Sequence, residues 1–312
     1  MQNTRKMDFA ERRKWFIYEV KQSRTYYLFL LPYALVFITF LVLPVIISIF
    51  YSFTYYNIFE APKFVGLQNY TTLLLGDDEF LKAVTNTLLM ALITGPVGYI
   101  MAFIFAWFIH GLPRFLRAFA VLVFYAPTIS GQVFVIWSLI FAGDQYGYAN
   151  AFLRNIGVTA EGGQPFYFLT TPAMMMPIVL VVILWMSLGA GFLSFVAGLQ
   201  TVDPAQYEAG YIDGIRNRWQ ELWYITLPNM KGMLLFGAVM AITQSFGVAD
   251  VTVALCGFPS TDYAVHTIVN HLVDYGSLRF EMGYASAIAT LLFGVMILCN
   301  KYIQKFINRI GK

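Results

Sequence analysis

The residues able to carry acid–base, nucleophilic or metal chemistry are few and scattered. The chain has three histidines, His110, His266 and His271, and two cysteines, Cys256 and Cys299. His266 and His271 do not share one helical face, so we expect surface polar residues there and no metal site. The cysteines form no CxxC pair and fall in or near apolar runs, which disfavours a disulfide framework. Neither an HExxH motif nor a recognisable catalytic triad is present, so we predict no enzyme.

A nucleotide-binding loop is also missing. The sequence contains no G-x-x-x-x-G-K-[ST], the pattern whose backbone cradles phosphates and whose hydroxyl binds magnesium. Any ATP-driven work must therefore be done by another chain. We expect this chain to bind neither a cofactor nor a metal.

The most informative polar stretch runs from Asp203 to Pro228, DPAQYEAGYIDGIRNRWQELWYITLP, between two apolar runs. Asp203 can cap a first helical turn, and Pro204 suits the first helical position because its missing N–H would be unpaired there. Gly214 can supply the left-handed turn that ends a helix. The pattern predicts a short helix with both ends specified.

This predicted helix carries small and acidic residues. Ala205, Ala209 and Gly210 are small, whereas Glu208 and Asp213 are acidic. A small, acidic surface favours close contact with a partner. The alternative is an ordinary amphipathic helix that rests on a bilayer.

A second set of candidates consists of polar and aromatic residues inside apolar runs. Polar groups at such positions are costly and usually face a pathway. Planar polar groups and aromatic faces suit a sugar, although single aromatic residues can simply pack in a core or an interfacial belt, and Asn86 can cap a helix. Asp250 can equally pair with a basic group or hold a helix joint. The candidates are Gln244, Asp250, Ser245, Gln132 and Asn86, with Tyr125, Trp137 and Trp185 as aromatic platforms.

Composition indicates the elements that hold these residues. The chain is 59% hydrophobic and only 12% charged, whereas soluble domains carry about 25% charged residues. Six apolar runs are each long enough to span a bilayer. We predict an all-α membrane protein with spans at 27–53, 84–109, 116–142, 173–198, 232–254 and 284–305. Prolines 32, 44, 96, 127 and 177 predict kinks in these helices.

The distribution of basic residues predicts the orientation. With a cytoplasmic N-terminus, only Lys63, Lys82, Arg154 and Arg279 of the 20 basic residues lie outside. Both termini and the loop 199–231 are then cytoplasmic. The predicted organisation is an N-terminal tail, 1–24, a membrane domain, 25–305, and a C-terminal tail, 306–312.

We expect an amphipathic helix at the outer membrane surface within residues 255–283. Its apolar residues recur at helical spacing, and polar residues occupy the other faces. The apolar set is Val265, Ile268, Val269 and Leu272, and the polar set is His266, Asn270, His271 and Asp274.

The stretch E-A-G-Y-I-D-G, followed by Leu227-Pro228, resembles the EAA signature of permease subunits of binding-protein-dependent ABC importers. Glu208, Ala209, Asp213, Gly214, Leu227 and Pro228 match that pattern, and Gly210 replaces its second alanine. The replacement keeps the residue small and weakens the helix by roughly 1 kcal/mol.

The resemblance extends over most of residues 25–305, and the matching stretches are similar to those of the carbohydrate-type branch of this family. Further matching stretches are Phe64–Tyr70, Asn86-Thr87, Arg117 with Pro127 and Trp137, Gly147 with Asn150, Leu153 and Gly157, and Gly283–Ala287. One departure is the turn Cys256-Gly257-Phe258-Pro259, where the family often has a Gly-rich turn ending in proline.

This resemblance implies a type I ABC importer permease architecture in the cytoplasmic membrane. It implies a sugar or oligosaccharide pathway and four kinds of partner besides the solute: a second permease, cytoplasmic ATP-hydrolysing subunits, an extracytoplasmic substrate-binding protein and the lipid bilayer. No nucleic acid partner is expected. The matched helix is then the coupling helix, with Glu208, Ala209, Gly210, Asp213, Gly214 and Pro228 as coupling residues.

Two rival functions follow from different readings of the same chain. One is a permease for glycerol phosphate, a polyamine or an amino acid, although an anionic solute demands basic residues that the spans lack. The other is a secondary transporter that needs no ATPase, and it predicts inverted repeats and intramembrane charge pairs that the sequence does not display.

Overall fold

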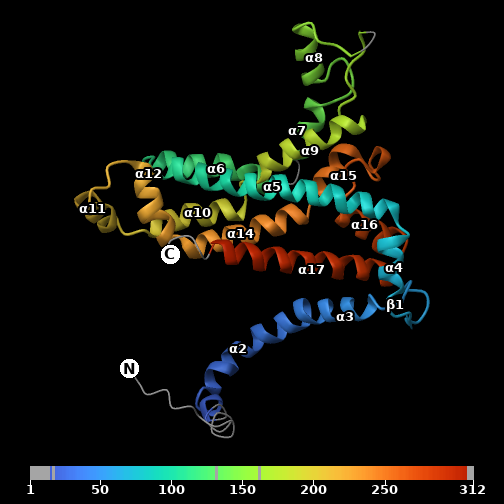
Figure 1. Cartoon of the computed structure of the whole chain (residues 1–312), viewed down its shortest axis with the longest axis horizontal. Coiled ribbons are helices and arrows are strands. Elements are labelled where there is room, and N and C mark those ends of the chain that lie inside the picture. The colour runs from blue at the N-terminus through green and yellow to red at the C-terminus, as the bar shows by residue number, and fades with distance from the viewer. Residues whose placement is uncertain (1–14, 16–17, 131–132, 161–162, 308–312) are drawn as a thin grey trace.

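The computed structural model describes residue 15 and residues 18–130, 133–160 and 163–307. Within this part of the chain, five helical stretches are long and apolar enough to cross a membrane, and one bent helix pair brings the number to six. The only sheet among the described residues is one short antiparallel pair of strands. The expectation of an all-α protein with six spans is confirmed, and Figure 1 shows most spans running side by side.

The first three spans differ in regularity. The first comprises α2 (Arg24–Phe37), the π-helical turn η1 (Ile38–Val42) and α3 (Leu43–Tyr51). The second is the continuous helix α5 (Asp78–His110), which begins earlier than predicted because Asp77 caps it by accepting a hydrogen bond from the Phe80 N–H. The third is the pair α6 (Arg114–Ile129) and α7 (Val133–Ile140), at 82° to each other.

The last three spans include two more interrupted helices. The fourth span is α9 (Pro172–Met186) with α10 (Ala190–Thr201), and the fifth is α14 (Lys231–Phe246) with α15 (Asp250–Cys256). The sixth is the single helix α17 (Met282–Ile307). The spans therefore lie close to their predicted positions, but three of them are divided in two.

Short elements cover the two ends of the helix bundle. At one end lie β1 (Thr54–Tyr55), β2 (Lys63–Phe64), α4 (Gln68–Leu75), η4 (Thr261–Tyr263), α16 (Ile268–Val273) and η5 (Asp274–Leu278). At the other end lie α11 (Pro204–Ile212), α12 (Arg218–Glu221), η3 (Leu222–Thr226) and α13 (Leu227–Asn229). The helix α8 (Tyr148–Asn155) projects away from the spans.

Two of the interruptions contain glycine and no proline. Helices α2, α5 and α9 continue through Pro32, Pro96 and Pro177, and Pro127 lies inside the last turn of α6. The breaks at 187–189 and 247–249 instead contain Gly189 and Gly247, whose backbones weaken a helix. The breaks in spans four and five therefore lie at glycines, whereas the bend between α6 and α7 follows Pro127, and Pro44 lies in the first turn of α3, directly after η1. The kinks at the remaining prolines stay a prediction.

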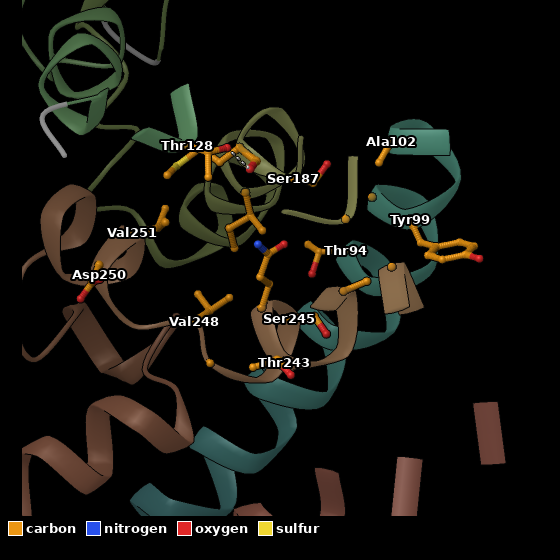
Figure 2. Close-up of a pocket in the computed structure, with 18 of the residues that line it drawn as sticks. Thr94, Tyr99, Ala102, Thr128, Ser187, Thr243, Ser245, Val248, Asp250 and Val251 are labelled. Atoms are coloured by element: carbon orange, nitrogen blue, oxygen red, sulfur yellow. Dashed lines mark hydrogen bonds between the residues drawn. The ribbon is translucent and has the colours of Figure 1, made fainter. Parts of the chain in front are cut away.

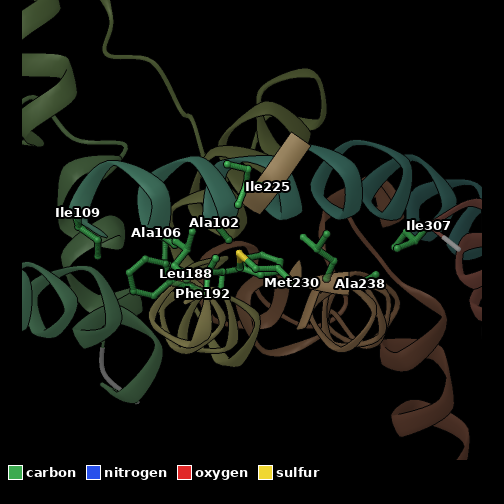
Figure 3. Close-up of a cluster of buried hydrophobic side chains, with 13 residues drawn as sticks. Ala102, Ala106, Ile109, Leu188, Phe192, Ile225, Met230, Ala238 and Ile307 are labelled. Atoms are coloured by element: carbon green, nitrogen blue, oxygen red, sulfur yellow. The ribbon is translucent and has the colours of Figure 1, made fainter. Parts of the chain in front are cut away.

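Helices α5, α10 and α14 enclose the main core. Ala106, Phe192, Phe195 and Met230 are among its buried side chains, and Ile225 of η3 and Ile307 of α17 complete it (Figure 3). By contrast, no side chain of α2 or α3 is buried, and Figure 1 shows α2 diverging from the other spans. The core therefore fixes the loop 199–231 against spans two, four and five.

Candidate functional site

A cavity of about 480 Å³ lies where the interrupted spans meet. Thr94, Tyr99 and Ala102 reach it from the middle of α5, Thr128 and Ser187 from α6 and the α9–α10 break, and Thr243 and Ser245 from α14 (Figure 2). Its polar groups are mostly hydroxyls, together with the amide of Gln244 and the carboxylate of Asp250. Such a lining can bind the hydroxyl groups of an uncharged solute.

The helix breaks supply part of this lining because they expose backbone groups. The hydroxyl of Thr128 donates to the carbonyls of Met186 and Leu188, at 3.3 and 3.2 Å, and so joins α6 to the α9–α10 break. Gly189 at the same break leaves room for Gln244: a Cβ atom at position 189 would lie 2.8 Å from Nε2 of Gln244. A side chain at position 189 would therefore displace the Gln244 amide.

Three of the predicted pathway residues, Gln244, Ser245 and Asp250, line this cavity. Ser245 is buried and donates to the Ile242 carbonyl, whereas Gln244 and Asp250 are exposed. Sequence reasoning missed the threonines, serine and tyrosine that accompany them, because hydroxyl groups inside an apolar run resemble ordinary helix residues. The missed lining residues are Thr94, Tyr99, Thr128, Ser187 and Thr243.

The other predicted pathway residues lie elsewhere. Asn86 donates its two amide hydrogens to the carbonyls of Tyr263 and His266, at 2.9 and 3.0 Å, so it ties α5 to the segment before α16. Trp137 contacts Trp185 edge-on, with ring centroids 5.4 Å apart, and Tyr125 is half-buried; none of the three lines the cavity. Gln132 lies outside the described residues, and its role stays a prediction.

The second part of the candidate site is the loop helix α11, whose ends form as predicted. The carboxylate of Asp203 accepts a hydrogen bond from the Ala205 N–H at 3.0 Å, and Pro204 occupies the first helical position. At the other end Gly214 has a φ of +94°. The Ile215 N–H donates to the Gly210 carbonyl and the Gly214 N–H to the Tyr211 carbonyl, the two bonds of a Schellman motif.

The two faces of α11 have different surroundings. Glu208, Ala209 and Asp213 are exposed to solvent, which leaves them free for a partner. Gly210 is buried, and a Cβ atom there would lie 2.6 Å from Cδ1 of Ile225 and 3.1 Å from Cδ1 of Ile215. We predicted that the small size of Gly210 allows a partner to approach α11 closely. The structure shows instead that this glycine allows α11 to pack against its own loop.

Hydrogen bonds hold α11 on the segment that leads into the fifth span. The Tyr207 and Thr226 hydroxyls are 3.0 Å apart, and the Asn229 amide donates to Gln206 at 2.5 Å. Pro228 is half-buried in α13, directly before α14 begins at Lys231. A force on α11 can therefore reach α14, and through α14 the cavity.

A buried polar network lies at the opposite end of the bundle. The carboxylate of Asp77 accepts hydrogen bonds from the hydroxyl of Tyr284 at 2.7 Å and contacts Nε2 of His271 at 3.0 Å. His266 and His271 are buried, so the prediction of surface histidines is wrong. The polar face of α16 points inward, because Asn270 also donates to the hydroxyl of Thr252 in α15.

This burial determines the protonation of the network. Burial, and to a smaller extent the nearby His271, lowers the pKa of the His266 imidazole to about 4, so the ring is neutral at pH 7. Burial also acts to raise the pKa of Asp77, but the hydrogen bonds from Phe80 and Tyr284 and the His271 interactions outweigh it. The pKa of Asp77 therefore lies below its ordinary value, and its carboxylate stays charged.

One set of possible metal ligands occurs in this network. Ligand atoms of Asp77, Glu79 and His271 lie within 4.8 Å of one another. The hydrogen bonds from Phe80, Tyr284 and His271 already account for the position of Asp77. The absence of a metal site in this chain stays a prediction.

Comparisons with known proteins agree with this architecture. The chain is 30% identical over 277 residues to the arabinooligosaccharides transport system permease protein AraP of Bacillus subtilis, covering 88% of this chain and 85% of that protein. It is 28% identical to the probable ABC transporter permease protein YesP of the same organism, covering 91% of each.

The fold is shared with a solved transporter. A chain in the crystal structure of a bacterial alginate ABC transporter, in complex with an alginate pentasaccharide-bound periplasmic protein, superimposes with a TM-score of 0.74 at 23% identity, covering 94% of this chain and 97% of that one. The family model described as "Binding-protein-dependent transport system inner membrane component" matches residues 94–309. Since this match covers more than half of the chain, the protein belongs to that family of ABC transporter permeases, which are not enzymes.

Proposed function

We propose that this permease forms half of the translocation pathway for an uncharged sugar or oligosaccharide. The observation that carries this proposal is the cavity at the helix breaks, with its hydroxyls and one amide. Sugars are bound by such polar groups and by aromatic faces. The relative AraP, named for arabinooligosaccharide transport, supports the same solute class.

The charge of the cavity favours a neutral solute over an anionic one. Asp250 is the only charged residue among the described residues that line it, and it is negative. An anionic solute such as glycerol phosphate would need basic groups at this site. The cavity therefore supports a neutral sugar better than the rival solutes that carry a phosphate.

We also propose how ATP hydrolysis by a partner subunit is coupled to transport through this chain. The exposed, acidic face of α11, with Glu208, Ala209 and Asp213, would dock on a cytoplasmic subunit that hydrolyses ATP. Closure of paired ATPase subunits would move α11, and the contacts of Gln206 and Tyr207 would transmit that motion to α14. A second permease would complete the pathway, and an extracytoplasmic binding protein would deliver the solute. The chain itself would bind no ATP.

The sidedness of this proposal has its own test. A cysteine at Gln206, exposed on α11, should react with a membrane-impermeant maleimide only in inside-out vesicles. A cysteine at Ser277, exposed in η5 at the opposite end, should react only from the outside of intact cells. Labelling of both positions from the same side would contradict a cytoplasmic α11.

The solute class is tested by uptake into proteoliposomes that contain the whole transporter. Neutral oligosaccharides should be taken up, whereas uronate oligosaccharides of the same length should not. The variant Asp250→Lys should reduce this discrimination, because it replaces the one negative charge of the lining by a positive one. Strong uptake of uronates by the unmodified transporter would overturn the neutral assignment.

A further inference from the structure

The segment between α11 and the fifth span has two contrasting faces. In α12 and η3, the side chains of Leu222, Ile225 and Thr226 are buried against the core. Three aromatic residues of the same segment are exposed instead: Trp219 by 61%, Trp223 by 61% and Tyr224 by 73%. We refer to these three side chains as the aromatic face. So much exposed aromatic surface on one short segment requires a partner or an apolar environment.

The aromatic face lies at the level where the spans end. Figure 1 shows α12 and η3 running across the ends of the spans, whereas α11 lies farther out. The ring of Trp219 lies 5.1 Å from the ring of Trp107, in the last turns of α5. Trp107 in turn contacts Phe108, which is 59% exposed on the surface of that span. The aromatic face therefore continues a surface that a membrane-spanning helix presents to lipid.

Apart from the half-buried Glu221, the charges near the aromatic face differ in sign from those on α11. Arg216 and Arg218 are exposed, and neither forms an ion pair within the described part of the chain. Glu208 and Asp213, on α11, are acidic. An anionic membrane surface attracts the two arginines and repels the two carboxylates. This charge pattern is the one expected if α12 and η3 touch the membrane and α11 lies farther from it.

We propose that the aromatic face, together with Arg216 and Arg218, lies in the headgroup layer of the membrane and binds anionic lipid. Tryptophan and tyrosine prefer this layer because their rings are apolar and their N–H or O–H groups are polar. Arginine adds electrostatic attraction to anionic headgroups. The proposal goes beyond the coupling role of α11, because it concerns a different face of the loop and requires no ATPase.

A lipid anchor here would have a mechanical consequence. Ile225 packs against Gly210, and Thr226 contacts Tyr207, so η3 is the support on which α11 rests. If the aromatic face of η3 is held in the headgroup layer, a force on α11 rotates η3 instead of moving it away from the membrane. Motion would then pass into α14 and toward the cavity.

The proposal is tested with the full chain in nanodiscs that contain phosphatidylglycerol, after Cys256 and Cys299 are replaced by alanine. Nitroxide labels are placed at Trp223 or Tyr224, and a matched label at Ile212, which is 88% exposed on α11. Labels on the aromatic face should collide more with oxygen than with a water-soluble nickel complex, and the Ile212 label should show the reverse. The result at Trp223 and Tyr224 should be the same with and without a co-expressed ATPase subunit.

Two outcomes would overturn the proposal. If the nickel complex reaches Trp223 and Tyr224 as readily as Ile212, the aromatic face lies in water. If these labels become protected only when an ATPase or a second permease is present, the face is a protein interface instead of a lipid one.

The preference for anionic lipid has a separate measurement. Brominated phosphatidylglycerol should quench the fluorescence of Trp219 and Trp223 more than brominated phosphatidylcholine does, with the variant Trp219→Phe/Trp223→Phe as the background. Each of Arg216→Gln and Arg218→Gln should reduce this preference about fivefold. The control Lys301→Gln/Lys305→Gln, on the exposed end of α17, should leave it unchanged. Equal quenching by the two lipids would exclude a role for the arginines.

Discussion

Gly210 shows how one residue can be fixed by its own chain at a position that appears to belong to a partner interface. Its neighbours Ala209 and Glu208 are exposed, whereas Gly210 faces Ile225 and Ile215. A side chain at position 210 must displace the end of Ile225, and a side chain at position 209 meets only solvent in this chain. Adjacent small residues of the same motif therefore have different surroundings.

We predict that Gly210→Leu lowers the free energy of unfolding by about 1–3 kcal/mol, because it overpacks the contact with Ile225. Ala209→Leu, the matched control, should change stability by less than about 0.5 kcal/mol. Thermal unfolding of the purified chain in detergent measures both values. The second change Ile225→Ala should restore part of the loss in Gly210→Leu, and equal stability of the two leucine variants would contradict the packing shown by the structure.

Asn86 and Gln244 form a second pair of residues with contrasting roles. Asn86→Ala removes two hydrogen bonds to backbone carbonyls of the outer segment, so it should destabilise the chain by about 1–3 kcal/mol. Gln244→Ala should leave the folded amount unchanged and alter the rate or selectivity of sugar uptake, since Gln244 lines the cavity. Thermal unfolding and uptake, measured on both variants, separate these effects. Normal uptake by Gln244→Ala would remove it from the pathway.

At the scale of elements, helix α16 joins three spans through buried polar side chains. His271 contacts Asp77 at the start of α5, Asn270 contacts Thr252 of α15, and α17 supplies Tyr284 to the same carboxylate. The stability of this junction depends on pH, because the imidazole of His266 is buried beside His271 and its two ring nitrogens have no hydrogen-bond partner in the described part of the chain. The charged groups around His266 are Asp77, Glu79 and Asp274, besides His271.

We predict that the protein loses stability as the pH falls from about 6.5 to about 4. The pKa of His266 is lowered from 6.5 to about 4 by burial, so the unfolded chain takes up a proton in this range and the folded chain does not. The lowered pKa of Asp77 acts in the same direction at still lower pH, because its carboxylate must be charged to keep its hydrogen bonds. Unfolding temperatures measured across this range test the prediction.

The variant His266→Leu supplies the control for this pH dependence. It keeps an apolar group of comparable size and removes the titrating ring, so the decline between pH 6.5 and 4 should become shallower. The same decline in His266→Leu as in the unmodified chain would assign the effect to other groups.

The elements also show what the sequence can predict. Apolar runs placed all six spans, and the cap at Asp203 and the turn at Gly214 placed both ends of α11. The breaks at 187–189 and 247–249 were missed, since an apolar run averages over a short interruption. Contacts between distant positions were missed as well: Asn86 bonds to residues 177 and 180 positions away. A local sequence pattern cannot predict a hydrogen-bond partner that lies so far away along the chain.

At the scale of the whole molecule, the cavity and α11 are connected through one helix. α14 begins beside the contacts that hold α11 and ends at the break that lines the cavity. The proposed mechanism uses this connection: ATPase subunits move α11, α14 follows, and the cavity opens to one side of the membrane or the other. Its central claim is that energy enters through the exposed face of α11.

The most direct test of that claim is ATP-driven sugar uptake by proteoliposomes that carry the complete transporter with Ala209→Trp. The indole would occupy the exposed face of α11, so we predict that uptake falls at least tenfold while the chain remains folded in the membrane. Gln304→Trp, at an exposed position near the end of α17, should transport normally. Full uptake by Ala209→Trp would contradict α11 as the point where energy enters.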